Sequence, residues 1–104
     1  MNKFLTKNEI EKFKEDGAIF LKNKFDISWI NKLKTGIEKD ISNPSPRFKS
    51  HTTKKNVPAY LEDYWTWHLV SEFKDFVFNS PYAQIASELM SAKKINLVML
   101  ERKY

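Results

Sequence analysis

Four large aliphatic residues recur at intervals of three and four positions in one segment: Ile30, Leu33, Ile37 and Ile41. That spacing puts them on one side of an α-helix, so the segment predicts an amphipathic helix with an apolar stripe. Its other side carries Lys32, Lys34, Glu38, Lys39 and Asp40. Asp26 is a candidate N-cap for this helix. Pro44 and Pro46 end it, because proline lacks an amide donor and disfavours helical geometry in the residue before it.

Start and stop signals predict three further helices. Thr6 and Glu9 have capping-box spacing, and Gly17 suits the left-handed residue that ends a helix. Ser71 is a candidate cap for a helix over residues 72–79. Ser80 followed by Pro81 marks the start of a fourth helix. The expected buried face of that fourth helix is Ile85, Ala86, Leu89 and Met90.

Two short runs rich in β-forming residues predict strands at residues 18–22 and 94–100, and residues 59–64 predict a shorter extended segment. A loop is expected over residues 43–59. The predicted order is therefore helix, strand, helix, loop, two helices and strand, which is an α+β arrangement. The apolar run at 94–100 needs neighbours on both faces, so we expect one partial domain over residues 1–104.

The net charge of +5 is concentrated in residues 41–60, which carry Arg47, Lys49, Lys54 and Lys55 and no acidic residue. Such a segment fits either an anion site or a solvated loop, and both interpretations stay open. The chain has no cysteine, which excludes disulfides and thiolate metal sites and fits a cytoplasmic location. Its two glycines exclude a glycine-rich phosphate loop, and no apolar run reaches the ~20 residues of a membrane helix.

The stretch YLEDYWTWHL, residues 60–69, combines rings, two carboxylates and a histidine. Glu62 and Asp63 are adjacent, so they point to opposite faces of an extended segment and are not expected to act as an acid–base pair. An iron site there needs His68 and a carboxylate to meet His51, the only other histidine. We therefore interpret Trp65 and Trp67 as core or pocket wall rather than as a stacking platform for nucleic acid.

Several segments, taken in order, resemble the N-terminal region of phytanoyl-CoA dioxygenase-like proteins: LTKNEIEKFKEDGAIFLKNKFD, NPSPRFKS, YLEDYWTWHLVSEFKDFVFNSPYAQIASELM and KKINLVM. The resemblance runs from about Leu5 to Met99. It implies the mostly helical N-terminal part of a double-stranded β-helix, or cupin-like jelly roll. Members of that family are oxygenases that hydroxylate small organic substrates with Fe(II), O2 and 2-oxoglutarate.

The family holds iron with an H-x-D pair and a later histidine, and 2-oxoglutarate with an arginine further on. These 104 residues contain no H-x-D or H-x-E, and the tail LERKY departs from the family pattern. We therefore expect a truncated and inactive chain that lacks catalytic, cofactor-binding and metal-binding residues, through an early stop, a frameshift or deliberate shortening. By position in the family fold, the substrate-side candidates are Arg47, Lys49, Tyr64, Trp65 and Trp67.

An alternative hypothesis is a small basic binding or interaction module. Its ligand would be an anion or a nucleic acid, or the C-terminal strand would pair with that of a second copy. No nucleic-acid motif supports nucleic-acid binding, so nucleic acid is not an expected partner. A membrane is not an expected partner either.

Overall fold

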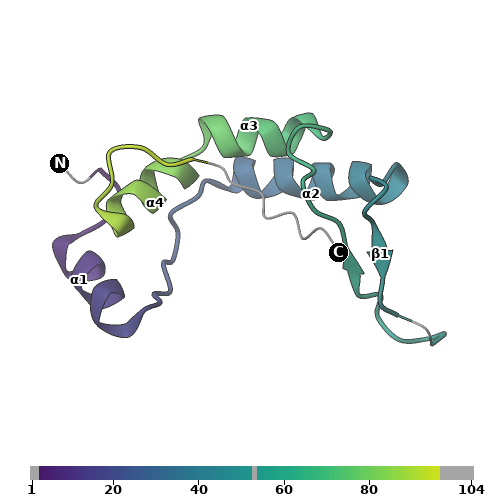
Figure 1. Cartoon of the computed structure of the whole chain (residues 1–104), viewed down its shortest axis with the longest axis horizontal. Coiled ribbons are helices and arrows are strands. Elements are labelled where there is room, and N and C mark those ends of the chain that lie inside the picture. The colour runs from purple at the N-terminus through teal and green to yellow at the C-terminus, as the bar shows by residue number, and fades with distance from the viewer. Residues whose placement is uncertain (1–2, 53, 97–104) are drawn as a thin grey trace, which may run out of the picture.

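The computed structural model describes residues 3–52 and 54–96, and in that part it is a mostly helical α+β fold with one two-stranded sheet. Its elements are α1 (Lys7–Asp16), α2 (Ile27–Ser42), β1 (Lys49–Ser50), β2 (Leu61–Glu62), α3 (Ser71–Asn79) and α4 (Tyr82–Met90). Helices α2 and α3 lie side by side along the length of the molecule (Figure 1). Helices α1 and α4 are at one end, and the β1–β2 hairpin extends from the other (Figure 1).

Three of the predicted caps are present. The amide of Glu9 donates to Thr6 Oγ1 at 3.1 Å and the amide of Thr6 donates to Glu9 Oε1 at 2.9 Å, which completes the capping box of α1. Gly17 ends that helix with φ of 76°, a conformation that glycine adopts without steric cost. Asp26 caps α2 by accepting from the amide of Ser28 at 3.1 Å.

The prediction that Ser71 caps α3 is wrong. Val70 occupies the cap position with extended φ and ψ, and Ser71 is already the first helical residue. Its hydroxyl donates to Glu72 Oε1 at 2.9 Å instead of accepting from the helix. Pro81 occupies the cap position of α4, and the Ser80 hydroxyl before it accepts from the amide of Tyr82 at 3.2 Å.

The predicted strand at residues 18–22 is absent; the segment has no regular structure and Phe20 is 81% exposed. Its β-forming residues have no strand beside them among residues 3–52 and 54–96, and propensity alone does not make a strand. Residues 94–96 also lack regular structure, and the rest of the strand predicted at 94–100 lies outside the described residues. The predicted loop instead contains β1, which pairs antiparallel with β2.

Gly36 is the point of closest approach between α2 and α3. A Cβ atom built on it would lie 2.6 Å from Phe73 Cε1 and 3.2 Å from Glu72 Cβ, so only glycine fits without displacing the neighbour. Ion pairs from Lys32 to Asp75 and from Lys39 to Glu72 bridge the same two helices. The polar side of α2 therefore faces α3.

A small core joins α1 and α4 and includes Leu5, Ile10 and Ile85. The carboxylate of Glu88 on α4 is part of this junction, and the residue is only 6% exposed. It accepts hydrogen bonds from the backbone amides of residues 3, 4 and 5, the shortest two at 2.7 and 2.9 Å. This carboxylate fastens the N-terminal segment to α4. Met90, predicted to share the buried face of α4, is exposed instead.

The apolar stripe of α2 is largely uncovered. Ile30 is 38%, Ile37 51% and Ile41 50% exposed, and Ile27 extends the same ridge. The chain exposes 8728 Å², whereas a compact monomer of 12.4 kDa exposes about 6,100 Å². Its radius of gyration is 16.5 Å, compared with about 13 Å for a compact domain of this length. The amphipathic helix is confirmed, but its apolar face is not part of a core in this structure.

Candidate functional site

An aromatic pocket lies where α2, α3, α4 and the segment before α3 meet. It has a volume of about 340 Å³. Five of its eight lining residues are aromatic: Trp65, Trp67, Phe73, Phe76 and Tyr82. The others are Leu33, Thr66 and Val77. The rings of Phe76 and Tyr82 have centroids 5.6 Å apart, so the two helices share an aromatic contact at the pocket. An apolar, partly preformed pocket of this size is typical of a small-molecule site.

Two local features present the tryptophans to this pocket. The amides of Leu69 and Val70 both donate to the carbonyl oxygen of Thr66 at 2.9 Å, which closes a turn that leads into α3 and carries Trp67. Trp65 has φ of 57°, in the left-handed region. A bulky residue in that region is a strained outlier that costs on the order of 1–3 kcal/mol and is found most often at functional sites.

Arg47 places a positive charge beside the pocket. Its guanidinium carbon lies 5.0 Å from the centroid of the Trp65 ring and 5.8 Å from that of Tyr64. Its Nε donates to the carbonyl oxygen of Tyr64 at 3.1 Å, which fixes the orientation of the group. His68 lies against Trp65 as well, with ring centroids 4.7 Å apart. Trp65 is therefore in contact with a cation and with a second ring.

The Asp63 carboxylate ties Ser45, in the loop that carries Arg47, to residues 63–64. Asp63 accepts from the amide of Ser45 at 2.9 Å, from the Ser45 hydroxyl, and from the amide of Tyr64 at 2.9 Å. Burial raises the pKa of the Asp63 carboxyl, but the Ser45 hydrogen bonds outweigh it and leave the pKa below its usual value. The pKa of Asp40 is raised to about 6, first by burial and then by the hydrogen bond and charge of Asp63. The two pKa values are thus shifted in opposite directions, and Asp40 is the carboxyl group that takes up a proton first as pH falls.

The structure brings together four of the five predicted substrate-side residues. Arg47, Tyr64 and Trp65 form one cluster, and Trp67 lines the same pocket as Trp65. Lys49 lies apart, on β1 of the exposed hairpin. The basic segment therefore divides into one cation at the pocket and others along the hairpin.

The carboxylates and histidines of residues 51–68 have separate partners. Glu62 Oε2 lies 2.6 Å from His51 Nε2, Asp63 bonds to Ser45, and His68 lies between the rings of Trp65 and Trp67. Across residues 3–52 and 54–96, no group of three or more His, Cys, Asp or Glu residues is placed to hold a metal. These side chains do not fit the two-histidine, one-carboxylate site that iron requires in oxygenases of this kind.

Several residues of the site were not predicted from the sequence. Asp40 belongs to the polar side of α2, and no local pattern links it to Asp63. For Ser45 the sequence gives one indication, which is that the prolines on both sides of it restrict the loop. Phe76 and Tyr82 have helical spacing that indicates a buried face but not a pocket.

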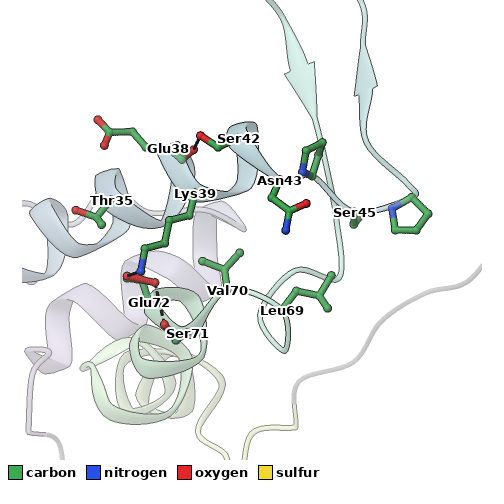
Figure 2. Close-up of a pocket in the computed structure, with 12 residues that line it drawn as sticks. Thr35, Glu38, Lys39, Ser42, Asn43, Ser45, Leu69, Val70, Ser71 and Glu72 are labelled. Atoms are coloured by element: carbon green, nitrogen blue, oxygen red, sulfur yellow. Dashed lines mark hydrogen bonds and ion pairs between the residues drawn. The ribbon is translucent and has the colours of Figure 1, made fainter.

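A second, larger pocket of about 880 Å³ lies between the C-terminal half of α2 and the start of α3 (Figure 2). Most of its lining residues are polar or charged, and the Lys39 side chain crosses it to meet Glu72 (Figure 2). Lys39 and Glu72 thus neutralise each other, and Glu38 adds a second carboxylate to the lining. The aromatic pocket, whose neighbouring Arg47 has no carboxylate partner among the residues described, is the stronger candidate site.

Comparison with models of known protein families, with curated proteins and with solved structures finds no match to this chain. None of the helices described is both long enough and apolar enough to cross a lipid bilayer.

Proposed function

We propose that these 104 residues form the N-terminal, substrate-side region of a phytanoyl-CoA dioxygenase-like fold. In this proposal the helices pack against a double-stranded β-helix, and the iron and 2-oxoglutarate ligands lie on polypeptide other than these residues. The proposal rests on the ordered sequence resemblance between about Leu5 and Met99. The chain has a binding role in it, in a cytoplasmic protein that acts on a small organic substrate.

One structural observation carries the proposal: the exposed isoleucine ridge of α2. Ile27, Ile30, Ile37 and Ile41 lie along about 21 Å of helix at 1.5 Å per residue, and each is at least 38% exposed. Together with an excess of roughly 2,600 Å² of exposed surface over a compact monomer, the ridge suits a helix that packs on further protein structure. A helix with one apolar face is stable chiefly when that face is covered.

The aromatic pocket supplies the substrate-side role. Trp65 and Trp67 come from the segment that the family resemblance assigns to the substrate side, and Arg47 adds a fixed positive charge beside them. In this proposal the pocket binds and orients a substrate. The chain alone is then a binding region without turnover.

Two measurements test this proposal. The first reads all three frames of the coding DNA after the codon for Tyr104, where we expect an H-x-D motif, a later histidine and an arginine. The second supplies the purified chain with Fe(II) and 2-oxoglutarate, and no succinate is expected. Absence of such motifs in every frame would overturn the family assignment. Stoichiometric Fe(II) uptake, with His51 and His68 as spectroscopically identified ligands, would overturn the binding-only role.

A further inference from the structure

We infer that the aromatic pocket binds a planar aromatic carboxylate, with its rings among the aromatic side chains and its carboxylate on Arg47. The inference deepens the proposed function, on which its biological meaning rests, by naming the ligand class of the same pocket. The binding itself depends only on the pocket and on Arg47.

The lining of the pocket selects for flat rings. The rings come from three elements. Trp65 and Trp67 come from the segment before α3, Phe73 and Phe76 from α3, and Tyr82 from α4. Aromatic pairs favour offset or edge-to-face contact at centroid separations of 4.5–7 Å, so a planar guest has partners on its face and on its edge. Phe76 already makes such contacts with Phe25 at 5.4 Å and with Trp29 at 6.1 Å, which support the wall from behind.

The charge beside the pocket selects for an anion. Arg47 uses one N–H on the Tyr64 carbonyl oxygen, and its other four N–H groups bond to no acceptor among residues 3–52 and 54–96. Two of these can meet a carboxylate side by side, the geometry that makes arginine a preferred carboxylate ligand. The Asp63 carboxylate accepts from Ser45 and from the Tyr64 amide, and no ion pair joins Arg47 to an acidic residue among residues 3–52 and 54–96. The guanidinium is therefore available.

The backbone at Trp65 is the second, independent observation. Its φ of 57° places a large ring in a conformation that tryptophan seldom adopts. The backbone amide and carbonyl of Tyr64, the residue before Trp65, are held by Asp63 and by Arg47. A core ring needs no such strain, whereas a ring preset to face a ligand reduces the ordering cost of binding.

The test titrates the full chain with 2-naphthoate and with its uncharged counterpart 2-naphthalenemethanol, followed by calorimetry and tryptophan fluorescence. We expect saturable 1:1 binding of 2-naphthoate and at least about tenfold weaker binding of the alcohol, because a hydrogen-bonded ion pair is lost. Arg47→Gln should remove that preference. Lys49→Gln, which deletes a cation from the exposed hairpin of the same basic segment, is the matched control and should keep it.

A pocket variant separates ring recognition from charge recognition. Trp67→Ala should weaken both ligands alike, with the fold checked by circular dichroism. The inference is overturned by no saturable binding of 2-naphthoate, by equal affinity for the two ligands, or by equal effects of Arg47→Gln and Lys49→Gln. Any of these results leaves the family assignment intact, because the DNA sequence and the iron assay test it separately.

Discussion

Gly36→Ala tests whether close packing of α2 on α3 holds the central part of the fold. The new methyl carbon would lie 2.6 Å from Phe73 Cε1 and 2.9 Å from Cδ1, whereas carbon atoms pack at about 3.5–4.0 Å. The overlap of about 1 Å is the kind of overpacking that costs about 1–3 kcal/mol. Alanine recovers up to about 1 kcal/mol through helix propensity. We expect a net loss of about 1 kcal/mol.

Urea unfolding followed by circular dichroism measures this effect. With a slope of about 1–3 kcal/mol per molar urea, the midpoint should fall by roughly 0.3–1 M. Thr35→Ala is the control, because this neighbouring residue is exposed and bonds only to the carbonyl oxygen of Asn31 in its own helix. Its midpoint should stay the same or rise. If Gly36→Ala raises the midpoint as Thr35→Ala does, the helices are not in contact at this position.

Four further substitutions probe other parts of the chain. Glu88→Gln should cost about 1–3 kcal/mol at pH 7 through weakened hydrogen bonds to three amides. Hydrogen bonds lower the folded pKa of Glu88 despite its burial. The stability that the Glu88 carboxylate contributes is therefore present above the unfolded pKa of about 4.3 and is lost as pH falls through the folded pKa. If Glu88→Gln is still less stable than the parent at pH 2, this reasoning is wrong. Asp40→Asn should stabilise the chain at pH 7. The folded pKa of Asp40 is about 6 and its unfolded pKa is about 3.9, so the parent protein loses stability as pH rises from about 4 to 6. An equal gain at pH 4 would show that the carboxyl pair is not responsible. Ile85→Ala in the core should cost about 2–5 kcal/mol, whereas Ile37→Ala on the open ridge should change stability by less than about 0.5 kcal/mol; similar losses would mean that the ridge is covered.

Local signals predicted the helices well, because each cap depends on residues within a few positions of one another. The Thr6–Glu9 box, Gly17 and Asp26 need no tertiary partner to act. The prediction that Ser71 caps α3 failed because the turn at Thr66 sets the chain path before α3. That path brings Val70 to the cap position. The strand at 18–22 failed for a related reason. A strand requires a second strand beside it, and local composition cannot state whether one is present.

Packing was harder to predict than helix formation. The spacing of Ile30, Ile37 and Ile41 correctly gives an apolar face but does not say what covers it. Gly36, which looks like a weak point in a helix, is instead the contact with α3. Lys32 and Lys39, on the expected solvent side, form ion pairs across that contact. Small and charged residues at a helix crossing carry no periodic signal, so only the three-dimensional arrangement identifies them.

The two tryptophans illustrate how a pocket differs from a core when the sequence reads the same for both. In a core, a large ring is enclosed in relaxed backbone geometry and gains stability from burial. Trp65 is 38% exposed, has a left-handed backbone, and lies under the Arg47 guanidinium, which donates to the carbonyl group of the preceding residue, Tyr64. The strained backbone at Trp65 lowers the stability of the fold, and the partial burial of its ring offsets little of that loss. The geometry is therefore better explained by a surface prepared to receive a ligand, and removing Arg47 should affect binding much more than folding.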